Sequence, residues 1–175
     1  QIIIVTESIF SMDGDQADLQ ALVELKRRYD NVLLYVDEAH AFGVRGKQGL
    51  GCAEEFGCIR DIDFLVGTFG KAAASVGAYI VCKKVVREYL VNRMRTLIFT
   101  TGLPPVNIAW TLFVVRRLAD MQERREHLAN ISRMLREILQ EQGYECPSTS
   151  HIVPMVVGPS ADTILRAEAL QRHGF

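Results

Sequence analysis

The sequence predicts an α/β fold built on a mainly parallel sheet. An apolar segment, residues 1–6, is followed by helical spacing of apolar residues over 17–29 and then by a second apolar segment, residues 32–36. A strand, a helix and a strand in this order form the unit from which parallel sheets are built. The second strand runs into polar residues, as does a further apolar segment, residues 62–66. Open α/β sheets bind their ligands at the carboxyl ends of strands, so a site is expected there.

Composition places the chain among ordinary globular proteins. Of its 175 residues, 49% are hydrophobic and 23% are charged, and the net charge is −1. This balance argues against disorder and predicts neither a nucleic-acid partner nor a membrane-surface partner. No apolar run is long enough to span a bilayer. The four cysteines lack the spacing of metal ligands, which predicts reduced thiols, no metal site and a cytoplasmic location.

The first helix and the loop after the second strand follow from local signals. The helix predicted at residues 17–29 follows a turn, and either Asp15 or Asp18 is expected to cap it. Five glycines between residues 43 and 57 predict a loop too flexible for regular structure. Strands at residues 62–66 and 77–81 flank a tight connection, which predicts an antiparallel hairpin.

The second half of the chain is predicted to be mainly helical. Pro104 and Pro105 suit the first turn of a helix, and an apolar face over residues 128–139 predicts a long helix that Gly143 ends. The elements expected after the hairpin are a helix at 83–95, a short strand at 97–101, a helical stretch at 106–142 with a bend near 120–123, a strand at 151–157 and a helix at 161–173 capped by Ser160 or Asp162.

The chain is expected to divide into two domains. A boundary near residue 118 would separate residues 1–118 from residues 119–175. The chain opens inside a strand and closes where another strand should follow a helix, so we expect it to be part of a longer protein.

Lys71 is the first candidate for a functional side chain. It lies between predicted apolar strands and precedes three alanines. Partial desolvation of its amine is therefore expected, which would lower the pKa and favour a nucleophilic amine. The alternative is an exposed turn lysine without a function.

Asp37 and His40 follow the second strand and point to the same site. A buried carboxylate such as Asp37 needs a positive partner, because leaving it unpaired is costly. A protonated pyridine nitrogen supplies that partner, and pyridoxal phosphate (PLP) enzymes combine this pairing with a lysine. His40 could stack on the cofactor or form a hydrogen bond with it. The alternatives are a capping role for Asp37 and a structural role for His40.

The segment Asp37-Glu38-Ala39-His40 also spells a motif of nucleoside-triphosphate-dependent helicases. That class also needs a phosphate-binding loop with a fixed spacing of glycines and a Ser or Thr after its lysine. The spacing in residues 67–72 is too short, and Ala72 follows the lysine. A Walker-type ATPase therefore remains only a distant alternative.

Four ordered segments together resemble the α-oxoamine synthases. These are fold-type I PLP-dependent transferases that condense an amino acid with an acyl thioester and release carbon dioxide. The resemblance implies that residues 1–118 are the second half of a PLP-binding large domain and that residues 119–175 begin an α+β small C-terminal domain. The segments are residues 11–15, residues 36–44 with Gly46, Gly49 and Gly51, residues 68–72 and residues 100–105.

The resemblance implies a role for each polar residue near the cofactor ring. Lys71 would hold PLP as a Schiff base and later transfer protons. Asp37 would pair with the pyridine nitrogen. His40 and Ser11 would contact the phenolic oxygen or its surroundings.

The resemblance also implies that three threonines bind phosphate. Thr68 would hold the phosphate of the cofactor. Thr101, with Thr100 beside it, would reach the phosphate of the neighbouring subunit's cofactor, which implies a homodimer with shared active sites. The family's glycine-rich phosphate loop, ring-stacking residue and carboxylate-binding arginine have no match in this sequence, so the chain alone is expected to be inactive.

The residues of two motifs narrow the choice of expected substrates. Residues 37–43 with residues 67–71 look closest to the biotin-pathway branch of the family, which joins L-alanine to a pimeloyl thioester carried by coenzyme A or a carrier protein. The serine palmitoyltransferase, 2-amino-3-ketobutyrate ligase and 5-aminolevulinate synthase types remain open. A noncatalytic homologue is a further alternative, although such a relative should have lost Lys71.

Overall fold

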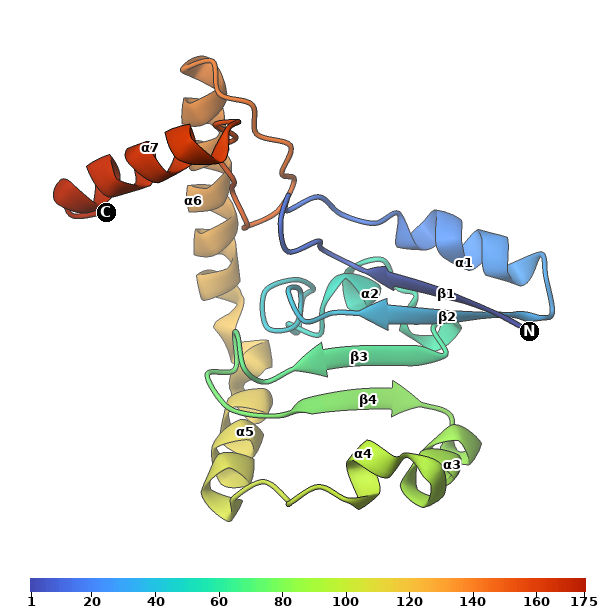
Figure 1. Ribbon diagram of the computed structural model, residues 1–175. Coiled ribbons are helices and arrows are strands. Elements are labelled where there is room, and N and C mark those ends of the chain that lie inside the picture. The colour runs from blue at the N-terminus through green and yellow to red at the C-terminus, as the bar shows by residue number, and fades with distance from the viewer.

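The computed structural model describes residues 1–175 as a four-stranded sheet with helices around it (Figure 1). The strand order is β1-β2-β3-β4. Strands β1 (Ile2–Glu7), β2 (Val32–Asp37) and β3 (Phe64–Thr68) run parallel, and β4 (Ala78–Cys82) pairs antiparallel with β3. This topology confirms the α/β class, the strand-helix-strand unit and the predicted hairpin.

Helix α1 (Leu19–Arg27) connects β1 to β2 and covers one face of the sheet. Leu19 and Val23 are its buried residues, and the Asp18 carboxylate caps its first turn by accepting from the Ala21 N–H at 2.9 Å. Of the two predicted caps, Asp18 is therefore the one that the structure uses. The apolar side chains of this face form a core cluster of 11 buried residues, which includes Leu34 of β2.

The opposite face of the sheet is apolar as well, but the chain leaves much of it exposed. Ile3 and Val5 of β1 are 54% and 67% exposed, and Ile80 of β4 is 42% exposed. Parallel strands usually have both faces buried, which is why their sequences read as continuous apolar runs. The same property made the strands of this chain easy to find in the sequence.

The glycine-rich loop is more regular than its sequence predicts. It contains the short helix α2 (Cys52–Glu55), so the expectation of a structureless loop over residues 43–57 is wrong. The loop is ordered by carboxylates that accept backbone N–H groups: Glu54 accepts from Gln48 and Leu50, and Glu38 accepts from the start of α2. Glycine spacing alone gives no sign of these contacts.

Glu38 is the carboxylate that joins the strand ends to this loop. It is fully buried, and it accepts hydrogen bonds from the Ser8 hydroxyl at 2.6 Å, the Cys52 N–H at 3.0 Å and the Ala53 N–H at 2.6 Å. Burial raises the pKa of Glu38, against the opposite effect of these hydrogen bonds. Gly51 leaves the room for this arrangement, because a Cβ there would lie 2.7 Å from the Glu38 carboxyl carbon.

The rest of the chain is helical apart from its connections. The bend expected near residues 120–123 is observed as a short 3-10 turn between two helices, and the first of those helices begins at Pro105 as predicted. The elements are η1 (Ile59–Asp61), α3 (Lys84–Arg93), α4 (Arg95–Ile98), α5 (Pro105–Arg117), η2 (Leu118–Met121), α6 (Gln122–Glu141) and α7 (Ser160–Arg172).

Two predicted strands and one predicted cap are wrong. Residues 97–101 begin inside α4 and continue without a strand, and residues 151–157 form no strand. Apolar alternation predicts a strand only if a partner strand is available, and neither segment has one in this chain. Helix α7 is present, but its N-cap is Pro159, and neither Ser160 nor Asp162 caps it.

Arg125 anchors α6 to the first half of the chain. The residue is 6% exposed, and its guanidinium donates to the Leu118 carbonyl at 2.6 Å, the Lys47 carbonyl at 2.6 Å and the Gln122 side chain. The charge is therefore satisfied by carbonyl and amide oxygens rather than by a carboxylate.

No helix in residues 1–175 combines the length and the apolar character needed to cross a bilayer.

We expect Glu38→Gln to destabilise the protein by about 1–3 kcal/mol, because the amide nitrogen would face a backbone N–H and leave a buried donor unpaired. Thermal or urea unfolding of the purified variant measures the change. Glu24→Gln, an exposed position on α1, is the matched control and should stay within about 0.5 kcal/mol of the parent. Equal stability of both variants would show that Glu38 does not hold the loop.

Candidate functional site

The candidate site lies where β2 and β3 end. Asp37 is the last residue of β2 and pairs in register with Val66 of β3, and Thr68 is the last residue of β3. Both strands run in the same direction, so their carboxyl ends open onto one edge of the sheet. In Figure 1 this edge faces the column formed by α5 and α6.

The Asp37 carboxylate has one oxygen in use and one open. Oδ1 accepts from the Ala39 N–H at 2.8 Å and closes an Asx turn. No helix begins there, so the helix-capping role weighed for this residue is not observed. Oδ2 accepts no hydrogen bond, and no Lys, Arg or His nitrogen lies within 4.0 Å of the carboxylate. The chain thus supplies no cation of its own to this acid.

His40 lies half-buried in the turn after β2. Its pKa is lowered, first by burial and then by the charge of Lys71, while Glu7 and Asp37 act in the opposite direction. An imidazole with a lowered pKa is neutral at pH 7. The same interactions place His40 within electrostatic range of Lys71 and Asp37, as the sequence predicts.

Lys71 is exposed, and the predicted partial desolvation of its amine is not observed. The reason is its position: residues 69–77 form a connection that leaves the sheet after β3, so Lys71 lies beyond the strand and not between strands. Its amine forms no ion pair with a carboxylate of the chain.

Helix α5 fixes the turn that carries Lys71. The Trp110 indole N–H donates to the Ala73 carbonyl at 3.2 Å and to the Ala74 carbonyl at 3.0 Å. Ala74 has a φ of +47°, a conformation that side chains with a Cβ rarely adopt without support. The next residue of α5 is Thr111, and its hydroxyl lies 2.7 Å from the Ser75 hydroxyl.

Thr68 uses its hydroxyl within the same turn. Its Oγ1 donates to the Gly77 carbonyl at 3.1 Å and accepts from the Gly70 N–H at 3.1 Å. One lone pair of the hydroxyl oxygen remains.

The other three predicted site residues lie apart from this group. Ser11 is exposed in the turn after β1, and its hydroxyl forms no hydrogen bond to Asp37, His40 or Lys71. Thr100 and Thr101 are exposed in the connection from α4 to α5, where the Thr100 hydroxyl donates to the Thr101 carbonyl at 3.4 Å. The structure brings together Asp37, His40 and Lys71, and it does not bring the two threonines to them.

Three residues that support the site were missed by sequence reasoning. Ser8 follows β1 as a polar residue at a strand end, which is the signal that could have found it. Trp110 and His151 lie far from the site in sequence, and no local pattern marks them. The pKa of His151 is lowered by burial first and then by His40 and Arg45, so the tertiary fold brings this second imidazole within electrostatic range of His40.

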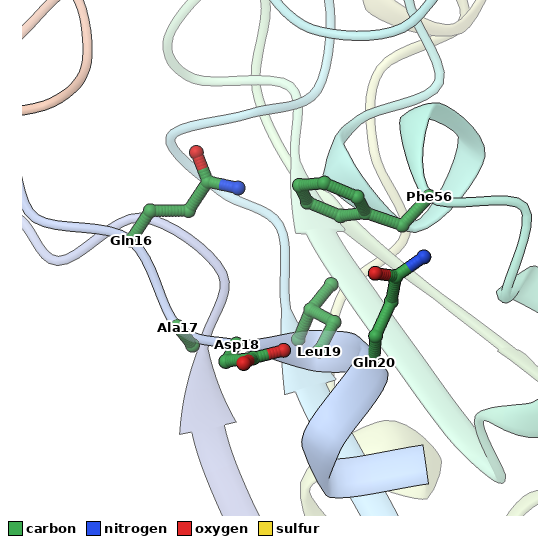
Figure 2. Close-up of a pocket in the computed structure, with 6 residues that line it drawn as sticks. All are labelled: Gln16, Ala17, Asp18, Leu19, Gln20 and Phe56. Atoms are coloured by element: carbon green, nitrogen blue, oxygen red, sulfur yellow. The ribbon is translucent and has the colours of Figure 1, made fainter. Parts of the chain in front are cut away.

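A separate small cavity lies at the start of α1 and takes no part in this site. Its volume is about 240 Å³, and Figure 2 shows the Phe56 ring and the side chains of Gln16 and Gln20 around it. The Asp18 carboxylate in its wall already caps α1. The cavity contains none of the predicted site residues.

Comparison with known proteins shows the family of the chain. A model of the aminotransferase class I and II family matches residues 1–174. A protein from Glaesserella parasuis serovar 5 (strain SH0165), named as an 8-amino-7-oxononanoate synthase, is 57% identical over an alignment that covers 100% of this chain and 46% of that protein. The chain thus spans about half the length of the curated relatives that it matches.

Two solved structures have the same arrangement of elements. A serine palmitoyltransferase from S. paucimobilis, solved with bound PLP and myriocin, superposes with a TM-score of 0.90 at 30% identity, over 98% of this chain and 45% of that one. An 8-amino-7-oxononanoate synthase from Francisella tularensis gives a TM-score of 0.87 at 27% identity, over 99% of this chain and 51% of that one. The chain therefore belongs to the aminotransferase class I and II family, within which these relatives confirm its resemblance to the α-oxoamine synthases.

Proposed function

We propose that the protein carrying this chain is a PLP-dependent α-oxoamine synthase that condenses L-alanine with a pimeloyl thioester, carried by coenzyme A or a carrier protein, and releases carbon dioxide. The observation that carries the proposal is the grouping of an open carboxylate, a neutral imidazole and a free amine at the ends of β2 and β3. Lys71 is also the residue that a noncatalytic relative should lack.

The residues of the site fit PLP. Asp37 has an open oxygen and no cationic partner in the chain, which suits a protonated pyridine nitrogen. Neutral His40 can donate to the phenolic oxygen, and the remaining lone pair of Thr68 can accept from a protonated phosphate or a bridging water. When bound, PLP supplies an electron sink for the pair released at the substrate α-carbon.

The chain's own groups then account for orientation and proton transfer. The Asp37 carboxylate keeps the proton on the ring nitrogen. The Lys71 amine, in a turn held by α5, would bind the cofactor and, once the amino-acid substrate has displaced it, would accept the proton from the substrate α-carbon. His40 would donate a hydrogen bond on the oxygen side of the ring. The resemblance assigns the same side to Ser11, which lies apart from His40 in this chain.

Sequence similarity supports the choice of substrates. The relative from Glaesserella parasuis that is named as an 8-amino-7-oxononanoate synthase is 57% identical to this chain. The other members of the family remain alternatives. Glu38, fully enclosed by Ser8 and α2, has no open oxygen for Mg²⁺, which disfavours the Walker-type ATPase.

The proposal extends to assembly and location. Thr100 and Thr101 are exposed and uncommitted to their own chain's site, which suits contact with the cofactor phosphate of a second subunit in a homodimer. The division into residues 1–118 and 119–175 and a cytoplasmic location are also part of the proposal.

Borohydride reduction of the PLP-loaded full protein should fix the cofactor on the peptide that contains Lys71, as read by peptide mass mapping. Lys71→Ala should abolish this adduct, and Lys83→Ala, an exposed lysine after β4, should keep it. Cofactor on another lysine, or on none, would overturn the cofactor assignment.

Turnover tests the substrates separately. The full protein should release coenzyme A from pimeloyl-coenzyme A with L-alanine faster than from palmitoyl-coenzyme A with L-serine, and Lys71→Ala should lower kcat by roughly 10²–10⁴-fold or more, because it removes the acid-base group. A preference for palmitoyl-coenzyme A and serine would instead assign the serine palmitoyltransferase type.

The imidazole pKa of His40 should lie below 6.5 in the cofactor-free protein and should rise in Lys71→Ala, because the variant removes a neighbouring positive charge. Imidazole NMR across a pH titration measures both values, with Lys83→Ala as the control. Because the folded pKa lies below the unfolded value, the unfolded chain takes up the proton first, and the contribution of His40 to stability is lost as pH falls below 6.5. An unchanged His40 pKa in Lys71→Ala would show that the charge of Lys71 does not act on His40.

Trp110→Phe should weaken PLP binding by up to about tenfold, because it removes one shared hydrogen bond from the lysine turn and keeps the aromatic ring. Absorbance titration with PLP measures the affinity. Tyr89→Phe removes a polar atom from an exposed ring on α3 and should leave the affinity unchanged. Equal affinity in all three proteins would show that α5 does not position Lys71.

A further inference from the structure

A basic cavity lies between α6, residues 149–151 and the glycine-rich loop, outside the Asp37, His40 and Lys71 group. Its volume is about 350 Å³, and only 3 of its 13 lining residues are hydrophobic. It is therefore suited to a small polar ligand rather than to an apolar one. The charged and titratable groups in its wall are Arg45, Glu55, Arg125, Arg133, Arg136 and His151.

The wall of this cavity carries more positive charge than its own acids neutralise. Arg45 is paired with Glu55 through two hydrogen bonds of 2.7 and 2.8 Å, and Glu55 is the one carboxylate in the lining. Arg125 and Arg136 donate to neutral oxygens, the latter to the Ser150 carbonyl. Neither guanidinium has an acidic partner.

Among the arginines of this wall, Arg133 forms the weakest contacts with the rest of the chain. It has a hydrogen bond of 3.4 Å to the Asn130 side chain and an ion pair of 3.6 Å with Glu137, and its side chain is 63% exposed. Exposed pairs of this kind contribute little to stability. Arg133 can therefore turn toward a ligand at low cost.

His151 adds an unused polar atom to the same wall. Its Nδ1 is buried and has no hydrogen-bond partner, and it is the only such side-chain atom in residues 1–175. Buried polar atoms are nearly always paired, so an unpaired one indicates a missing partner. Burial, with His40 and Arg45 nearby, lowers the pKa of His151, so the ring is neutral at pH 7 and one of its two nitrogens carries a proton.

We propose that this cavity binds a small oxyanion, a carboxylate or a phosphate, with Arg133 and Arg136 supplying charge and His151 supplying a hydrogen bond. The charge excess, the unpaired ring nitrogen of His151 and the polar lining all suit one ligand of this class. The lining of the cavity contains none of Asp37, His40 and Lys71, and the inference does not depend on the proposed reaction.

Titration calorimetry of the PLP-loaded full protein tests the site, because bound cofactor already occupies its own phosphate position. Inorganic phosphate and succinate are the two probes, at constant ionic strength. Arg133→Gln and His151→Phe remove the proposed ligands, and Arg124→Gln removes one exposed charge from the same helix outside the cavity. Arg136 and Arg125 stay untouched because they bind backbone carbonyls.

We expect saturable binding of at least one probe, weakened about tenfold or more in Arg133→Gln, which loses a charge-assisted hydrogen bond, and unchanged in Arg124→Gln. Binding of phosphate alone would identify a phosphate ligand, and binding of succinate alone a carboxylate. Equal weakening in Arg133→Gln and Arg124→Gln, or no saturable binding of either probe, would overturn the proposal. Arg133→Gln keeps the test valid if His151→Phe fails to fold.

Discussion

The buried carboxylate of Glu38 is the contact on which the geometry of the site depends. It receives hydrogen bonds from Ser8 after β1 and from the first residues of α2, so it joins two strand ends and the glycine-rich loop through one side chain. Asp37 and His40 stand on either side of it in sequence. Holding Glu38 inward turns Asp37 to the other face of the strand end, because successive side chains of a strand alternate in direction.

The opposite wall of the site is built by a different part of the chain. Lys71 lies in a turn with a positive φ at Ala74, and the indole of Trp110 donates to the two carbonyls of this turn. A flexible amine on an unsupported turn would lose much of its orientation. Helix α5 supplies that support from 36 residues away in sequence, which links the helical half of the chain to the candidate site at the sheet edge.

Hydrogen bonds from arginine side chains, rather than apolar packing, connect helix α6 to the rest of the chain. Arg125 reaches carbonyls of η2 and of the glycine-rich loop, and Arg136 reaches the carbonyl of Ser150. The guanidinium suits this task because its five donors lie in one rigid plane and it stays charged at any physiological pH. The resulting concentration of arginines also gives the cavity beside α6 its positive character.

The sequence by itself determined the parallel strands, the helix between the first two of them and the polar residues at the strand ends. Apolar runs in buried strands and helical spacing are local patterns, and Asp37, His40 and Lys71 follow those runs directly. The tertiary structure decided what depends on distant partners. Residues 151–157 have the pattern of a strand but no strand to pair with, Lys71 is exposed because its turn leaves the sheet, and the contacts of Glu38, Trp110 and His151 join segments that no local pattern connects.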